Sequence, residues 1–166
     1  GDDQLARLRN TTIGFVFQQF NLLPRTPALR QVMLSLIYQR KSRREAERLA
    51  CAKLEAVGLS QRLHHLPTQL SGGQQQRVAI ARALAANPKL IIADEPTGAL
   101  DTATSAEIMT LLTQLNAGGI TVVVVTHEPE VAAFARRRIL FRDGEIVEDL
   151  RSTPLPQTRE TPHAFH

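Results

Sequence analysis

Cysteine and aromatic residues are scarce in this 166-residue sequence. A single cysteine, Cys51, excludes an internal disulfide framework and is typical of proteins from a reducing compartment. No tryptophan, one tyrosine and six phenylalanines leave few aromatic side chains, which argues against stacking platforms that bind single-stranded nucleic acid. The longest apolar run, residues 120–125, is far too short to cross a bilayer. These absences argue against a disulfide-rich secreted domain and against a membrane span within the sequence.

Basic residues are frequent, but few of them are lysine. The net charge is +4, and only Lys41, Lys53 and Lys89 are lysines among the 20 basic residues. This balance permits partners rich in phosphate, such as nucleotides, nucleic acids or anionic lipids. The basic clusters at 40–44 and 136–138 are short and typical of a solvated surface. A hydrophobic content of 43% indicates an ordinary globular core, so composition alone selects no function.

Local patterns predict a strand and then helices in the first part of the sequence. Residues 11–18 are β-branched and aromatic, which favours a buried strand. Two prolines punctuate a loop over 19–27. From there the pattern is helical, because apolar residues recur every three or four positions, and Gly58 stands where a helix C-cap belongs.

After Leu70 the sequence alternates between strands and helices. We expect a helix from Ser71 to about residue 86, strands over 89–93 and 120–126, a helix after Asp101, a short helix entered through Pro129, and a hairpin around Asp143-Gly144. Such alternation predicts an α/β fold whose parallel sheet is covered on both faces. We divide the chain into a core of residues 1–26 and 71–150, a helical insert of residues 27–70, and a tail or linker of residues 151–166.

The first informative motif is Leu-Ser-Gly-Gly-Gln at 70–74. Two glycines at the start of a helix are locally unfavourable, by roughly 1 kcal/mol each relative to alanine in a helix interior. Glycine allows close approach to the backbone, and a helix N-terminus offers free N–H groups, so Ser71, Gly72, Gly73 and Gln74 form a candidate anion site. A serine-capped helix after a tight turn explains the same residues, and the motif alone leaves both interpretations open.

A second motif places acidic residues at the end of a strand. Asp94 and Glu95 follow the apolar run at 90–93, and ligands bind at the carboxyl ends of strands in open parallel sheets. One carboxylate can bind Mg²⁺ while its neighbour positions a water molecule, although acidic pairs also end strands without a function. Gln18 ends one predicted strand and His127 directly follows another, so we expect both at the same edge. A structural histidine and a polar loop glutamine explain the same two positions.

These motifs together resemble a known family. The segments FVFQQFNLLP at 15–24, LSGGQQQRVAIARAL at 70–84, LIIADEPTGALD at 90–101 and VVVVTH at 122–127 resemble, in order and spacing, the ATP-binding-cassette (ABC) transporter ATPases. The resemblance covers about residues 11–149 and is strongest to the macrolide-export and lipoprotein-release branch. It implies a P-loop NTPase-like, mostly parallel sheet with a helical insert.

The resemblance also implies roles for individual residues. Gln18 is similar to the Q-loop glutamine, which senses Mg²⁺ and the attacking water and adjoins the permease contact. Asp94 resembles the Walker B aspartate that binds Mg²⁺, Glu95 the general base, and His127 the switch histidine. The signature motif, which binds the γ-phosphate of ATP held by the other subunit, is matched by Ser71, Gly72, Gly73 and Gln74. The D-loop at the dimer interface is matched by residues 99–101, which include Asp101.

On this resemblance, the expected activity is hydrolysis of ATP with Mg²⁺ to drive export or extraction. The expected partners are a transmembrane permease and a second nucleotide-binding domain in a head-to-tail dimer, with no nucleic acid. The expected location is the cytoplasmic face of the bacterial inner membrane.

One element of the family is missing from the sequence. A phosphate loop needs the pattern GxxxxGK[ST], and none of the nine glycines is followed by lysine. The family places this loop, and an aromatic residue that stacks on adenine, before the Q-loop, where only residues 1–17 stand here. Since the first residue is Gly1 and the first methionine is Met33, we expect a fragment that lacks the P-loop strand and helix. Such a fragment would be inactive alone and would expose apolar surface.

Two other functions remain as alternatives. DNA-repair and chromosome-maintenance ATPases carry a similar signature, but they insert long coiled coils for which the segment between Gln18 and Ser71 leaves no room. The other alternative is a non-catalytic, truncated interaction module.

Overall fold

The computed structural model describes residues 1–5 and 13–151, and the chain divides into two compact units, Gly1–Thr126 and His127–His166. In the first unit, residues 2–5 are helical and are followed by β1 (Ile13–Phe17), α2 (Ala28–Tyr38), α3 (Arg43–Ala56), the 3₁₀ turn η1 (Pro67–Gln69), α4 (Gly72–Leu84), β2 (Leu90–Asp94), α5 (Thr102–Ala117) and β3 (Thr121–Val125). The second unit contains α6 (Pro129–Ala132), β4 (Arg137–Arg142) and β5 (Glu145–Arg151).

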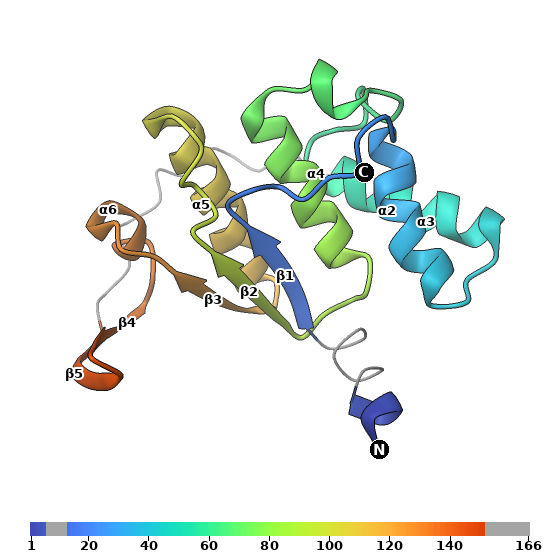
Figure 1. Ribbon diagram of the computed structural model, residues 1–166. Coiled ribbons are helices and arrows are strands. Elements are labelled where there is room, and N and C mark those ends of the chain that lie inside the picture. Colours follow the sequence, from blue (N-terminus) through green and yellow to red (C-terminus); the bar gives the residue numbers. More distant parts are fainter. Residues whose placement is uncertain (6–12, 152–166) are drawn as a thin grey trace. The chain divides into compact units, whose positions relative to one another are not determined.

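The three strands of the first unit form a parallel sheet in the order β1-β2-β3. Helices α4 and α5 lie on one face of this sheet (Figure 1). Gly14 of β1 permits the close approach of α4, because a Cβ there would lie 3.1 Å from the Cβ and carbonyl oxygen of Ala83. Val16, Ile91 and Ala93 are fully buried beneath these helices. The predicted α/β fold with a parallel sheet is confirmed.

The opposite face of the sheet is exposed, contrary to the prediction that both faces are covered. The sequence predicts a sheet covered on both faces, yet this face carries apolar side chains that are two-fifths to one-half exposed: Phe15, Phe17, Val123 and Val125. The rings of Phe15 and Phe17 stack on each other, with centroids 6.1 Å apart. No described helix packs over these side chains, so this face of the sheet exposes apolar surface.

Helices α2 and α3 pack against each other and against α4. The sequence predicts one helical stretch up to Gly58, but the structure interrupts it at residues 39–42, where Arg40 has a φ of 64°. Ser42 then caps α3 by accepting a hydrogen bond from the Glu45 N–H at 3.2 Å. Gly58, with a φ of 80°, ends α3 as predicted. The division into core, insert and tail remains a prediction, and the tail after residue 151 lies outside the described residues.

The predicted hairpin of the second unit is confirmed. Strands β4 and β5 pair antiparallel around Asp143 and Gly144, which both have positive φ, as a two-residue type I′ turn requires. The Arg137 guanidinium donates two hydrogen bonds to the Asp149 carboxylate, at 2.9 and 2.7 Å, and lowers the pKa of that carboxyl. Among residues 1–5 and 13–151, no helix is both long and apolar enough to span a membrane.

Candidate active site

Three of the predicted site residues meet at the carboxyl ends of β1 and β2. Phe17 and Asp94 are register partners on these neighbouring strands, so Gln18 and Glu95 leave the sheet side by side. Gln18, Asp94 and Glu95 line one pocket, together with flanking residues of β1 and its loop: Phe17, Gln19 and Asn21. The structure therefore brings the amide of Gln18 together with the two adjacent carboxylates, which lie more than seventy positions later in the sequence.

Glu95 is held in a conformation that residues other than glycine avoid. Its φ is 45°, in the left-handed region, which costs about 1–3 kcal/mol and persists only where the surroundings fix it. Two hydrogen bonds to the end of β3 do so: the Glu95 N–H donates to the Val125 carbonyl at 2.8 Å, and the Thr126 hydroxyl donates to Glu95 Oε2 at 3.1 Å. Sequence reasoning missed Thr126, because its partner lies on another strand.

The side chain of Gln18 lies against the turn that follows Glu95. A Cβ on Gly98 would come within 2.7 Å of Gln18 Cδ and Nε2, so only glycine leaves space for this amide. The turn is closed by a hydrogen bond from the Gly98 N–H to the Glu95 carbonyl at 3.1 Å. The only sequence signal for this contact was a glycine within the segment LIIADEPTGALD, and sequence reasoning gave it no role.

The Leu-Ser-Gly-Gly-Gln motif begins α4 with a reciprocal cap. Ser71 Oγ accepts a hydrogen bond from the Gln74 N–H at 3.2 Å, and Gln74 Oε1 accepts one from the Ser71 N–H at 2.9 Å. The predicted helix start at Ser71 is confirmed. The cap satisfies two backbone N–H groups that a helix N-terminus otherwise leaves without partners.

Packing within the chain explains why the motif has two glycines. A Cβ on Gly73 would collide with the Thr104 methyl group of α5, and a Cβ on Gly72 would lie 3.1 Å from Leu100 Cδ2. The pair therefore allows the first turn of α4 to pack against the start of α5. Sequence reasoning weighed an anion site and a tight turn, and it missed this packing. The anion site remains a prediction.

Asp101 caps α5, as the sequence predicts. Its carboxylate accepts hydrogen bonds from the Thr104 N–H at 2.8 Å and from the Thr104 hydroxyl at 2.9 Å. These bonds, led by the one from the Thr104 backbone, lower the pKa of Asp101 below its ordinary value. The placement of His127 against Glu95 remains a prediction, because His127 is the first residue of the second unit.

The loop after Gln18 is fixed by two side chains that sequence reasoning did not single out. Arg82 of α4 donates to the carbonyls of Phe20 and Asn21, at 3.1 and 2.7 Å, and its burial lowers its pKa. The buried amide of Gln31 donates to the Leu23 carbonyl at 2.7 Å and accepts from the Leu23 N–H at 3.0 Å. The loop therefore holds a defined shape between β1 and α2.

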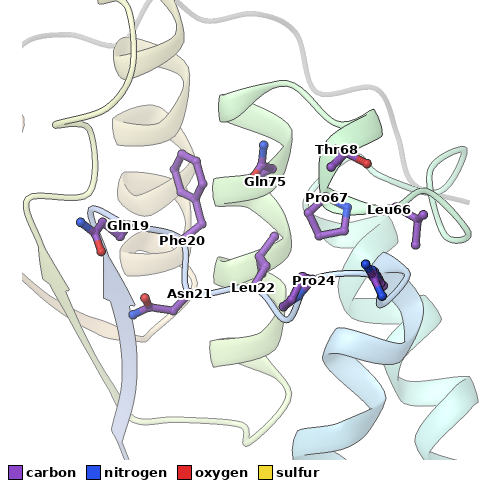
Figure 2. Close-up of a pocket in the computed structure, with 10 residues that line it drawn as sticks. Gln19, Phe20, Asn21, Leu22, Pro24, Leu66, Pro67, Thr68 and Gln75 are labelled. Carbon is purple, nitrogen blue, oxygen red and sulfur yellow. The ribbon is translucent and has the colours of Figure 1, made fainter.

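This loop forms one wall of a second, more apolar pocket. Figure 2 shows Phe20, Leu22 and Pro24 on the loop, Gln75 on α4, and Pro67 at the start of η1. Other lining residues are Gln19, Asn21, Arg25, Leu66 and Thr68. Because Gln19 and Asn21 line both pockets, a molecule bound in the apolar pocket would contact the same loop that carries Gln18.

The oxygen donors at this edge suit Mg²⁺. The carboxylate of Asp94 and the amide of Gln18 line the same pocket. No group of three or more His, Cys, Asp or Glu side chains converges anywhere in residues 1–5 and 13–151. A site with one or two protein oxygens fits Mg²⁺, which retains several waters and is bound largely through the phosphates of its substrate.

Comparison with known sequences supports the family that the motifs predict. The ABC transporter family model matches residues 2–98. The chain is 58% identical over 146 residues to the uncharacterized ABC transporter ATP-binding protein YknY of Bacillus subtilis, covering 88% of this chain and 64% of that protein. It is 57% identical over 151 residues to the macrolide export ATP-binding/permease protein MacB of Rhodopirellula baltica, covering 89% of this chain and 22% of MacB.

Comparison with solved structures supports the same fold. The chain superimposes with a TM-score of 0.78 and 50% identity on the ATP-binding cassette MJ0796, described as a dimer in a post-hydrolysis state bound to ADP and Pi. The match covers 91% of this chain and 67% of MJ0796. Thus the chain spans about two thirds of the length of the separate cassettes that it matches, and under a quarter of MacB.

Proposed function

The chain belongs to the ABC transporter family, and we propose that it forms the larger part of an ATPase subunit that drives export through a membrane permease. The observation that carries this proposal is the convergence of Gln18, Asp94 and Glu95 in one pocket at the edge of the sheet. We further propose that upstream sequence supplies the phosphate loop, because the 146 matched residues cover only 64% of YknY and the sequence has no GxxxxGK[ST] pattern. The chain together with that upstream sequence is called the full-length protein.

The reaction assigned to this pocket is attack of water on the γ-phosphorus of ATP. Glu95 accepts the proton of the attacking water, and the bond from the γ-phosphorus to the bridging oxygen breaks to release ADP and phosphate. Asp94 and Gln18 would hold Mg²⁺, which when bound neutralises charge on the phosphate oxygens. Gln18 is an uncharged amide beside both carboxylates, so it can orient the water without competing for its proton.

The nucleotide site is proposed to be completed by a second subunit. The first turn of α4, with the cap of Ser71 and Gln74 and the glycines Gly72 and Gly73, would bind the γ-phosphate of ATP held by that subunit. Asp101 at the start of α5 would lie at the same interface, because α4 and α5 begin in contact. His127 would complete the catalytic group. The dimeric state of MJ0796 supports a second nucleotide-binding domain as a partner.

The apolar pocket beside the Q-loop is proposed to receive the permease. Half of its lining residues are apolar, which suits an apolar segment of a protein partner: Phe20, Leu22, Pro24, Leu66 and Pro67. The name of MacB, an ATP-binding/permease protein, supports such a pairing. The protein would then lie at the cytoplasmic face of the bacterial inner membrane, associated through its permease.

The proposal is tested by steady-state ATP hydrolysis of the full-length protein carrying Glu95→Gln. We expect turnover to fall by about 10²–10⁴, as for loss of a general base, with ATP binding retained. Glu47→Gln is the matched control, because Glu47 is an exposed residue of α3 outside both pockets. Unchanged turnover in Glu95→Gln would overturn the assignment.

A further inference from the structure

A fully buried amide joins α4 to the two strand ends that carry the site. The side chain of Gln76 has no solvent exposure. Its Nε2 group donates to the Phe17 carbonyl at 3.0 Å and to the Pro96 carbonyl at 2.6 Å. Phe17 immediately precedes Gln18, and Pro96 immediately follows Glu95, so one NH₂ group is bonded next to each of two proposed site residues.

The amide is used here as a donor only. Both of its N–H groups serve the two carbonyls, whereas Gln76 Oε1 is buried and has no hydrogen-bond partner among the described residues. An unsatisfied buried acceptor is unfavourable, so the two donated bonds must outweigh it. Removing the amide would take a donor from both carbonyls, in a partly buried hydrogen bond at Phe17 and a buried one at Pro96. The site therefore requires a long, uncharged side chain that donates at its end.

Other contacts near Gln76 connect the two strand ends to each other and α4 to the loop after β1. The Gln18 side chain packs on Gly98, in the same turn that contains Pro96. Arg82, one and a half turns along α4, donates to the carbonyls of Phe20 and Asn21 on the other side of Gln18. Side chains of α4 therefore bond the backbone on both sides of Gln18 and the backbone after Glu95.

We propose that Gln76 is a positioning residue that sets the spacing between Gln18 and Glu95 and ties it to the position of α4. Because α4 begins at the glycine motif, a movement of its first turn would shift the two strand-end carbonyls together. Gln76 touches neither nucleotide nor water in this role, and it acts through the backbone beside the reacting groups. This inference rests on the proposed function of Gln18 and Glu95.

The test compares Gln76→Met and Gln76→Glu in the full-length protein. Both keep the length of the side chain. Methionine donates to neither carbonyl, and a carboxyl fully buried against two carbonyl oxygens stays protonated and can donate to only one of them. We expect kcat for ATP hydrolysis to fall about 10- to 100-fold, the scale of a misplacement near 1 Å, with KM for ATP within about twofold. Arg77→Met is the matched control on α4, because Arg77 donates to the Val57 carbonyl, away from the pocket.

A double-variant measurement separates positioning from simple loss of stability. With Glu95→Gln already present, Gln76→Met should lower the remaining rate by much less than it lowers the native rate, because both changes act on one step. An equal further loss would overturn the inference, as would a native kcat in Gln76→Met. Should Gln76→Met not fold, Gln76→Glu carries the same comparison.

These outcomes also distinguish the inference from the function on which it rests. If Glu95→Gln lowers turnover and neither Gln76 variant does, the inference is wrong and the proposed function stands. If Glu95→Gln leaves turnover unchanged, the proposed function is wrong, and the role of Gln76 is rejected with it.

Discussion

The hydroxyl of Thr126 donates a hydrogen bond to the carboxylate of Glu95 at 3.1 Å. This bond joins the residue after β3 to the residue after β2, and it lies beside the backbone bond from Glu95 to Val125. The proposed base is therefore fixed at both its backbone and its side chain by the neighbouring strand. Its strained φ of 45° is consistent with a site whose geometry is set by its surroundings.

Replacing Thr126 should reduce hydrolysis without weakening ATP binding. Thr126→Val keeps the shape of the side chain and removes the hydroxyl, and we expect kcat to fall about tenfold, because a hydrogen bond to a charged group contributes about 1.5–3 kcal/mol. Thr126→Ser keeps the hydroxyl and should retain most of the activity. Steady-state kinetics of the two full-length variants checks this. Equal losses in both would show that the hydroxyl is not the feature that matters.

Gly98→Ala should impair the site while leaving stability nearly unchanged. The added Cβ would meet only the end of the flexible, exposed Gln18 side chain, which can move aside, so we expect a stability change below about 1 kcal/mol. Moving Gln18 removes it from the pocket, and turnover should fall to the level of Gln18→Ala. Combining the two changes should cause little additional loss, since both act through the same amide. Additive losses would contradict this interpretation.

Gly73→Ala should destabilise the protein through its collision with Thr104. Overpacking of this kind costs about 1–3 kcal/mol. Thr104→Ser removes the colliding methyl group and keeps the hydroxyl that bonds Asp101, so the double variant should recover most of the lost stability. Urea unfolding measures both effects. Recovery of stability without recovery of ATP turnover would support the predicted anion site at Gly73, and no recovery of stability would contradict the packing account.

The capping role of Asp101 predicts a particular pH dependence. The Thr104 hydrogen bonds lower the pKa of Asp101 in the folded protein below its ordinary value of 3.8. The carboxylate therefore stabilises the folded state fully at pH values above its pKa in the unfolded chain. This stabilisation is lost as the pH falls through the pKa in the folded protein. Asp101→Asn keeps an acceptor but has no charge to lose. The difference in Tm between the native protein and Asp101→Asn should therefore be largest at neutral pH and shrink in acid. A difference independent of pH would exclude a contribution from the carboxylate charge.

Local features of this fold follow from the sequence. The caps at Ser71 and Asp101, the glycine after α3 and the Asp143-Gly144 turn each depend on residues within a few positions of one another, and all four are confirmed. The meeting of Gln18 with Asp94 and Glu95 was also predictable, because parallel strands deliver their carboxyl ends to one edge.

The features that sequence reasoning missed depend on distant partners. Gln76 bonds residues 59 and 20 positions away, and no periodicity distinguishes it from Gln75 beside it. The glycine pair suggested a ligand because nothing local indicated that Thr104 would occupy the space. Coverage of both faces of the sheet was wrongly predicted, because strands with runs of valine and isoleucine look the same whether a helix covers them or not. The lack of a phosphate-loop pattern, in contrast, had indicated exposed apolar surface.

The most direct test of the central claim is the single-turnover rate of ATP hydrolysis in the full-length protein loaded with ATP, measured by rapid quench. This rate reports the chemical step and excludes binding and product release. If Glu95 takes the proton of the attacking water, Glu95→Gln lowers the rate by about 10²–10⁴ while the bound ATP remains intact. A native single-turnover rate in Glu95→Gln would contradict the account.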